Sequence, residues 1–324
     1  MSAWKWWVVL LAWLGLSPAV AGLAADAAQM TAQITARGYA LHDLGGGAWW
    51  VCDGAYNTLF VVTEAGVVAV DPLPTLGANY LKAIAEVTPL PVTHVIYSHA
   101  HLDHIGAAGL FPREARVIAQ RQVGEALDLA ADPRRPPPTQ RFDRHLSLEV
   151  GGQRIELDYR GLNHAAGNLF IHLPRQRVLM LVDVVYPGYA PYPALGIAAD
   201  VQGYLDAHDQ ALAYDFDVLV AGHVDRLGTR EDVLASQRFA RELLATARRG
   251  LAAQPFPAFL KARPPGSTWL LHDDYETTQV QACVDALLPR WRERLVGLER
   301  SIASHCRTAV VALAVAPPHE PAHD

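Results

Sequence analysis

The stretch Ser98-His99-Ala100-His101-Leu102-Asp103-His104 constrains this chain more than any other. Three imidazoles and a carboxylate fall within the six residues His99–His104, directly after the apolar segment at residues 92–97, which is typical of a buried strand. A loop at the end of a strand can turn all four side chains into one cleft. Imidazole and carboxylate are the ligands that borderline divalent metals such as zinc prefer. The alternative is a polar loop that happens to be rich in histidine.

Composition narrows the classes of protein to consider. The 324 residues are 51% hydrophobic and 19% charged, which is typical of a globular chain with one large domain or two small ones. The net charge of -6 provides no basic surface for a polyanion, so nucleic-acid binding is not expected. A small-molecule substrate is easier to accommodate.

The N-terminus has the organisation of a signal peptide at residues 1–21. Residues 1–5 carry the positive charge, residues 6–16 form an apolar run, and Ala19-Val20-Ala21 resembles a cleavage site. The run is too short to span a bilayer comfortably, and no neighbouring cysteine suggests a lipid anchor. We therefore expect an exported protein, periplasmic or secreted, without a stable membrane anchor after cleavage; an uncleaved anchor is the alternative.

Beyond a linker or short helix at residues 22–37, the pattern predicts two sets of short strands, each followed by helices, within a domain at residues 38–232. Turn signals such as Gly45-Gly46-Gly47 separate the first strands, and Thr229-Arg230-Glu231-Asp232 resembles a capping box that opens a helix ending near Gly250. This alternation suggests two stacked sheets with helices outside. The expected strands lie at residues 39–44, 48–52, 57–63, 67–70, 92–97, 115–119, 146–150, 154–159, 168–173, 177–182 and 216–221.

The C-terminal part, residues 233–316, is expected to be a helical extension. An apolar stripe predicts one long amphipathic helix at residues 277–313, kinked at Pro289, whose apolar face the core or a second subunit must cover. The helix is therefore a candidate interface for a homodimer. Residues 317–324 are expected to be disordered. The stripe comprises Val280, Val284, Leu287, Trp291, Leu295, Leu298, Ile302 and Val310.

The cysteines leave two interpretations open. An oxidising compartment would favour a bridge between Cys283 and Cys306, but one continuous helix would hold them roughly 34 Å apart, at a rise of 1.5 Å per residue. Buried thiols are therefore favoured over a disulfide. Cys52 has no partner or catalytic context in the sequence.

Three single residues complete the candidate site. His164, Asp183 and His223 each follow the end of an expected strand. Residues that follow strand ends can converge on one rim of a sheet, although each of them taken alone could simply be a solvated loop residue. Together with residues 99–104 they form a larger set of ligands.

With these residues the chain resembles the metallo-β-lactamase-fold hydrolase superfamily. The resemblance covers residues 39–232 and includes Asn57 and the apolar run Val67-Val68-Ala69-Val70-Asp71. It implies an α/β (α+β) fold, a four-layer αββα sandwich of two mixed sheets with outer helices, to which the long C-terminal helical extension is added. The site would lie along the open edge between the sheets.

The resemblance also implies a ligand set for two metal ions. One metal would be held by His99, His101 and His164, the other by Asp103, His104 and His223, and Asp183 would bridge the two. We expect two Zn²⁺ per chain, with iron or manganese as alternatives. A hydroxide bridging the metals would be the nucleophile, since metals lower the pKa of bound water from 15.7 to about 7. Asp103 could orient it and pass its proton to the leaving group.

Two departures and one tyrosine bear on the substrate. Zinc β-lactamases usually carry Cys or Ser where this chain has Asp183, so the chain is more similar to the glyoxalase II, lactonase and phosphodiesterase branches. The segment around His164 differs from the family's usual Gly-His-Thr/Ser-x-Gly, with Asn163 before the histidine and Ala165 after it. Tyr186 is similar in position to a tyrosine that assists carbonyl polarisation in lactonases, although a packing role is the alternative.

The leading hypothesis is therefore a dinuclear zinc hydrolase of an acyl bond in a lactone or ester. Export argues against a glutathione thioesterase, and the acidic charge argues against a nuclease. The alternatives are β-lactam hydrolysis, an iron-dependent sulfur dioxygenase and a non-catalytic metal-binding protein.

Overall fold

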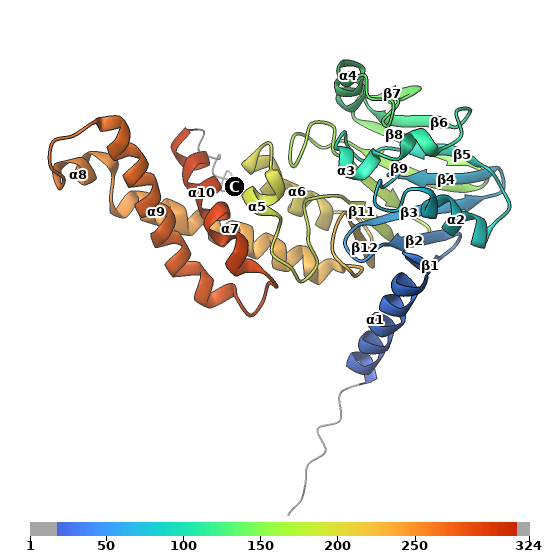
Figure 1. Cartoon of the computed structure of the whole chain (residues 1–324), viewed down its shortest axis with the longest axis horizontal. Helices are drawn as coiled ribbons and strands as arrows, with labels where there is room; N and C mark the ends of the chain where they lie inside the picture. Colours follow the sequence, from blue (N-terminus) through green and yellow to red (C-terminus); the bar gives the residue numbers. More distant parts are fainter. Residues whose placement is uncertain (1–17, 316–324) are drawn as a thin grey trace, which may run out of the picture.

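Two β-sheets stack face to face, with helices on both outer faces (Figure 1). This computed structural model describes residues 18–315, and the side chains of residues 28–315. In the first sheet the strands follow one another in sequence order, antiparallel from β1 to β4 and parallel from β4 to β7. They are β1 (Ala40–Gly45), β2 (Ala48–Cys52), β3 (Asn57–Thr63), β4 (Gly66–Val70), β5 (Val92–Ile96), β6 (Arg116–Gln120) and β7 (Gln140–Phe142).

The second sheet has the order β12-β11-β10-β9-β8. Only β11 and β12 pair in parallel, while the other neighbours are antiparallel. Both sheets are thus mixed, as the sequence predicts. The strands are β8 (His145–Val150), β9 (Gln153–Asp158), β10 (Phe170–Leu173), β11 (Val178–Leu181) and β12 (Val218–Ala221).

Alternation along the central strands supplies both hydrophobic layers. On β3, Leu59 and Val61 pack between the two sheets, whereas Phe60 belongs to the cluster beneath the outer helices. Successive side chains of a strand point to opposite faces, so a strand buried on both faces is apolar throughout. This explains why β3 and β4 are almost continuous runs of buried residues.

Helices close the sandwich on either side. The first sheet is covered by α2 (Ala78–Val87) and α4 (Arg121–Ala130), and the second by α6 (Val201–Leu212) and α7 (Arg230–Ala253). The predicted capping box opens α7, where the Thr229 backbone N–H donates to Asp232 at 2.9 Å. The αββα sandwich predicted from the sequence is confirmed.

Residues 22–37, for which a linker or a short helix was expected, lie in α1 (Pro18–Arg37). The end of this helix docks beside the first sheet, where Arg37 pairs with Glu86 of α2 and Gln33 accepts from the Leu41 backbone N–H. The predicted signal peptide lies largely outside the described residues, and export remains a prediction. Within residues 18–315, no helix is both long and apolar enough to cross a membrane.

The single long helix predicted at residues 277–313 is wrong. The chain forms α8 (Phe256–Lys261), α9 (Thr268–Trp291) and α10 (Leu298–Val315), and α9 and α10 pack against each other and against α7 (Figure 1). The connecting loop is held away from helical geometry by pairing with a distant segment. Val296 accepts from Ala190 N–H and donates to Gly188 O, both at 3.0 Å, and Gly297 has φ +77°.

This hairpin brings Cys283 and Cys306 together, with their Cα atoms 5.9 Å apart, and they form a disulfide. The favoured interpretation of two separate thiols is therefore also wrong, because the 34 Å estimate assumed one continuous helix. Cys52 is a buried free thiol. The apolar stripe itself is buried against α7 and the core of the same chain. The homodimer remains a prediction, and residues 317–324 lie outside the described part.

Candidate metal centre

The loop after β5 delivers four of the candidate ligands. The Asp71 backbone N–H donates to Ile96 O at 2.9 Å, and the Ser98 N–H donates to the Asp71 carboxylate at 2.7 Å, which fixes the point where the chain leaves the strand. His99 follows in a bend, and His101 has extended backbone before the next turn of helix. Asp103 and His104 then lie on the single turn α3 (Leu102–Ile105).

All seven predicted ligands meet at one place. One group contains His99, His101, His164 and Asp183, and the other contains Asp103, His104 and His223; in each group the ligand atoms lie within 4.8 Å of one another. The residues come from the loop after β5, from loops around β10 and β11, and from the end of β12. Each therefore follows a strand end, as expected.

Asp183 is shared by the two groups. Its Oδ2 lies 3.2 Å from His164 Nε2 and 3.1 Å from His104 Nε2, and its Oδ1 lies 3.0 Å from His223 Nε2. His99 Nε2 is 3.7 Å from Oδ2. One buried carboxylate thus faces imidazoles of both groups, as a bridging ligand would.

The donor atoms fit metal ions better than they fit one another. His99 Nε2, both ring nitrogens of His104 and Asp183 Oδ1 are buried without a hydrogen-bond partner among the described residues, despite these short distances. Buried polar atoms are ordinarily satisfied, and an unsatisfied one costs about 1–3 kcal/mol. Atoms that converge without bonding to one another point to common centres, and the N/O donor set suits divalent metals.

A hydrogen bond on the far side of the His164 ring selects the tautomer that metal binding requires, and the His99 ring has a polar partner at the same position. His164 Nδ1 lies 2.6 Å from Gly196 O, and His99 Nδ1 lies 2.9 Å from Ser98 Oγ. A carbonyl can only accept, so His164 Nδ1 carries the proton and Nε2 keeps its lone pair. A ligating histidine commonly has such a partner. Asn163, which departs from the family pattern, accepts from the His164 backbone N–H at 2.6 Å.

Burial and mutual contact also set the protonation states. Burial holds the pKa of His99 well below its usual range and lowers the pKa of His164 to about 4. Burial would raise the pKa of Asp183, but His104 and His223 outweigh it and hold that pKa well below its usual range. Neutral imidazoles and an ionised carboxylate are the forms that bind metals. For His104 burial acts downward, but Asp183 outweighs it and raises the pKa to about 9.

Backbone strain gathers around the site. Asp183 has φ +62°, Asp71 has φ +38°, and Val224, directly after His223, has φ +74°. Asn57 Nδ2 donates to both His223 O and Val224 O at 2.8 Å, which holds the strained loop in place. Strained residues persist where the surroundings over-determine them, and they cluster at functional sites.

Two tyrosines flank the metal ligands. Tyr186, which with Asp103 was predicted to act in catalysis, is buried, and its ring stacks on His223 with centroids 5.7 Å apart. Burial and then Asp183 hold its pKa well above 10. Sequence reasoning missed Tyr56, whose ring lies 4.5 Å from the His223 ring and 5.7 Å from the His104 ring. Only its place between a turn and a buried strand could have drawn attention to it.

The site needs a glycine at position 222, directly before His223. A Cβ at this position would lie 2.7 Å from Asp183 Oδ1 and 2.5 Å from Val182 Cγ1. No L side chain fits at those distances without moving the Asp183 carboxylate.

Comparison with known proteins agrees with this geometry. A curated relative, 2,4-dinitroanisole O-demethylase subunit alpha from Nocardioides sp. (strain JS1661), is 31% identical over 193 residues, which are 57% of this chain and 58% of the relative. The beta subunit is 31% identical over 145 residues, 42% of this chain and 44% of that subunit. Type 2 metallo-beta-lactamase from Bacillus cereus is 27% identical over 125 residues, 38% of this chain and 48% of the enzyme. The chain thus spans about half the length of these relatives.

Solved structures show the same fold. A metallo-beta-lactamase from Pontibacter korlensis superposes with a TM-score of 0.55 at 20% identity, covering 63% of this chain and 99% of that one. The sec-alkyl sulfatase PisA1 superposes with a TM-score of 0.62 at 17% identity, covering 86% of this chain and 50% of that one, so the likeness extends into the C-terminal helices. The sequence model of the metallo-beta-lactamase superfamily matches residues 53–223, more than half of the chain. The chain therefore belongs to the metallo-beta-lactamase superfamily.

Proposed function

We propose that this protein is a dinuclear, zinc-dependent hydrolase that cleaves the acyl bond of a lactone or ester. The observation that carries the proposal is the Asp183 carboxylate, which lies within 3.2 Å of imidazoles from both ligand groups. A shared carboxylate of this kind favours two cations held side by side. Members of the superfamily are mostly metal-dependent hydrolases, which supports the reaction class.

Each ligand group has a defined part. His99, His101 and His164 would hold one cation, Asp103, His104 and His223 the other, and Asp183 both. When bound, such cations lower the pKa of water to about 7 and polarise a carbonyl oxygen. The chain itself fixes the ligands, excludes water from the buried side of the site and moves protons.

Asp103 is the residue best placed to move a proton. The Asp103 side chain is 45% exposed, whereas that of Asp183 is 4% exposed. Asp103 Oδ2 lies 3.5 Å from His104 Nε2. An ionised carboxylate on the open side can orient an attacking water and later protonate the leaving group. Tyr186 is held neutral, so its hydroxyl is available as a hydrogen-bond donor.

The surroundings favour an uncharged substrate with an apolar or aromatic part. Exposed apolar side chains lie next to site residues in the sequence: Leu102 between two ligands, Leu162 near His164, and Ile197 after Gly196. Tyr192, six residues after Tyr186, is 60% exposed. Apolar surface with a few polar groups is typical of small-molecule sites.

A second candidate is hydrolysis of an aryl methyl ether. The observation that favours it is the 31% identity over 193 residues to a protein named as an O-demethylase of 2,4-dinitroanisole. In such a reaction water would replace the methoxy group of an electron-poor ring and release methanol. The same metal ligands and the same proton transfer by Asp103 would support this reaction.

Turnover by the purified zinc-loaded protein distinguishes these reactions. We would assay homoserine lactones, aryl esters, 2,4-dinitroanisole and a cephalosporin, with chelator-treated protein as the control. We expect the lactones or esters to be cleaved fastest. Preferred release of methanol from the ether would select the second candidate, and turnover of the cephalosporin alone would select β-lactam hydrolysis.

Metal analysis of the protein as purified, before any zinc is added, separates the remaining alternatives. Two zinc ions per chain are expected. One iron per chain together with oxygen consumption would favour a sulfur dioxygenase and overturn the hydrolase. Full metal occupancy without turnover of any substrate would favour a metal-binding protein.

A further inference from the structure

A left-handed turn lies beside the metal centre. Within α5 (Pro193–Ile197), Ala194, Leu195, Gly196 and Ile197 have φ values of +57°, +56°, +68° and +55°. Only one of the four is glycine, and left-handed backbone costs roughly 1–2 kcal/mol for each other residue. Such a turn persists only if its surroundings hold it.

Two side chains of helix α10 (Leu298–Val315) stabilise the start of the turn by accepting hydrogen bonds from its backbone. Ser304 Oγ accepts from the Ala194 backbone N–H at 2.9 Å, and His305 Nδ1 accepts from the Leu195 N–H at 3.1 Å. These two N–H groups are thereby satisfied by side chains more than 100 residues away. The buried His305 ring is neighboured by Cys306, whose disulfide ties α10 to α9.

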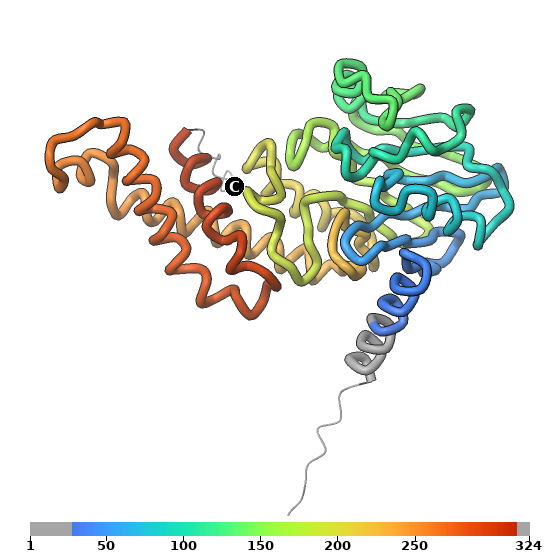
Figure 2. Tube along the Cα trace, in the orientation of Figure 1, coloured from blue at the N-terminus to red at the C-terminus, as the bar shows by residue number. Residues whose placement is uncertain are grey.

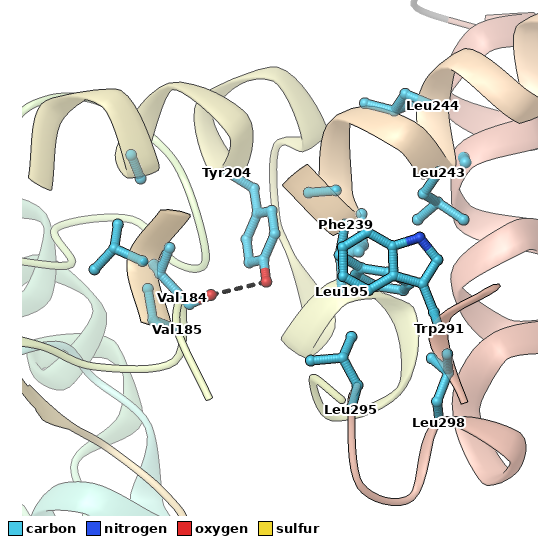
Figure 3. Packing of buried hydrophobic residues seen from close by; sticks show 14 of the residues in the cluster. Val184, Val185, Leu195, Tyr204, Phe239, Leu243, Leu244, Trp291, Leu295 and Leu298 are labelled. Atoms are coloured by element: carbon cyan, nitrogen blue, oxygen red, sulfur yellow. Dashed lines mark hydrogen bonds between the residues drawn. The ribbon is translucent and has the colours of Figure 1, made fainter. Parts of the chain in front are cut away.

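Hydrophobic packing acts on the same turn. Leu195 is fully buried in the cluster that also contains Phe239 of α7 and Trp291 of α9 (Figure 3). In the same cluster the Tyr204 hydroxyl donates to Val184 O at 2.8 Å, next to the bridging Asp183 (Figure 3). The C-terminal helices and the site thus share one continuous core.

The turn ends on the metal centre. Gly196 O accepts from His164 Nδ1 at 2.6 Å, and the chain after the turn bonds back to the same loop, from Ala199 N–H to His164 O at 3.0 Å. A Cβ on Gly196 would lie 2.8 Å from the Tyr186 hydroxyl and 2.9 Å from Asp183 O, so the turn packs directly against the site.

We propose that Ser304 and His305 of α10 are positioning residues for the metal ligand His164, acting through the left-handed turn and the Gly196 carbonyl. The inference rests on the metal centre of the proposed function but not on its substrate. It gives the C-terminal helices a part in metal binding that the sandwich alone would not supply.

Metal affinity, measured without any substrate, tests this. His305→Leu removes the Nδ1 acceptor but keeps a side chain that fills the buried space. His305→Asn keeps an acceptor near the position of Nδ1. We expect His305→Leu to weaken binding of zinc by roughly 10-fold, as loss of a ligand's supporting partner commonly does. Its Co²⁺-loaded form should also show a changed visible spectrum, and His305→Asn should restore most of both.

A second pair of variants guards against a folding defect. Ser304→Ala removes the other acceptor, and Ser301→Ala is the matched control, because Ser301 is buried one turn earlier on α10 and its hydroxyl has no hydrogen-bond partner among the described side chains. Ser304→Ala should weaken zinc binding by a few fold and Ser301→Ala should not. Unchanged affinity and Co²⁺ spectra in folded His305→Leu would overturn the proposal. If that variant does not fold, equal affinities of Ser304→Ala and Ser301→Ala would do so.

Discussion

Asp103 and Asp183 show how burial divides the work between two carboxylates. Asp183 is enclosed by four imidazoles, whereas Asp103 keeps 45% of its side chain exposed on the open side of the centre. The buried residue is suited to holding charge in place. The exposed one can meet substrate and water.

Replacing Asp103 tests this division. Asp103→Ala should lower kcat by about 100-fold or more, the usual contribution of a general acid-base group, while the melting temperature of the protein stays close to that of the wild type. Steady-state assays and thermal melts measure both. Glu114→Ala, at an exposed carboxylate away from the site, is the control. Near-normal rates in Asp103→Ala would remove Asp103 from the reaction.

Gly222 offers a test of how tightly the Asp183 carboxylate is packed. In Gly222→Ala the new methyl group would fall 2.7 Å from Asp183 Oδ1, so either the carboxylate or the β12 loop must move, at a cost of about 1–3 kcal/mol. We expect fewer than two metal ions per chain by elemental analysis. Gly266→Ala is the control, since the nearest atoms there are 3.9 Å away. Full metal content in Gly222→Ala would mean that the loop adapts freely.

At the scale of elements, the disulfide fixes the hairpin of α9 and α10. It links cysteines 23 residues apart in sequence. Because a bridge across a loop of this length lowers the conformational entropy of the unfolded chain, it raises the free energy of unfolding by about 3 kcal/mol. Replacing both Cys283 and Cys306 by alanine should lower the free energy of unfolding by that order in urea titrations. Cys52→Ala, at the buried free thiol, tests packing without a bridge. An unchanged stability in the double variant would argue that the bond contributes nothing.

The buried His208 on α6 should make the free energy of unfolding depend on pH. Its ring is fully buried, with Nδ1 at 2.8 Å from Tyr204 O and Nε2 at 2.9 Å from Ser236 Oγ, and burial lowers its pKa from 6.5 to about 4. Below pH 6.5 the unfolded state binds a proton that the folded state resists. The free energy of unfolding therefore decreases as the pH falls from 6.5 to 4, and His208 accounts for about 3 kcal/mol of the decrease.

Urea titrations at pH 7.5 and pH 4.5 measure that loss. The variant His208→Gln, which cannot take up a proton, should lose less stability between the two pH values than the wild type does. Equal losses in the two proteins would show that His208 does not contribute to the acid limb.

The C-terminal helices α9 and α10 share a hydrophobic core with the sandwich and are an integral part of the folded molecule. In Figure 2 the chain passes from the second sheet through α7 and then folds α9 and α10 back toward α5. Trp291, Leu295, Leu298 and Ile302 are buried in the core that also covers the second sheet. Each such side chain contributes roughly 1.5–3 kcal/mol.

Truncation after Gly250 should therefore prevent stable folding rather than release a lid. It would expose the apolar face of α7 that α9 and α10 cover, and would remove α10 from α5. Soluble yield and near-UV circular dichroism of the truncated chain measure this, with a chain truncated after residue 315 as the control. A folded, fully metallated product ending at Gly250 would contradict the prediction.

Much of the site follows from local sequence. Residues 99–104 carry their ligands within one loop, so no knowledge of distant contacts is needed to infer a metal. The short strands are equally local, because alternation and turn residues define them. His164, Asp183 and His223 could be grouped only through the resemblance to a family and their positions after strands, and the structure brings them together.

Other features depend on contacts between distant segments. The apolar stripe of α9 continues in phase into α10, so its period carries no signal that the chain reverses; the reversal rests on Val296 pairing with the segment at residues 188–190. The pairing of Cys283 with Cys306 follows from that reversal. Tyr56 likewise reaches the site only because β3 lies beside the end of β12.

The sequence by itself thus determined that a metal centre was to be expected, because four of the seven candidate ligands lie within residues 99–104 and strand periodicity is defined by neighbouring residues. Only the tertiary structure decided that the C-terminal helices fold back, form a disulfide and hold the turn at Gly196 beside His164. Those contacts join residues 23 to 110 positions apart, and a local pattern does not specify which distant partner a backbone N–H or a thiol will meet.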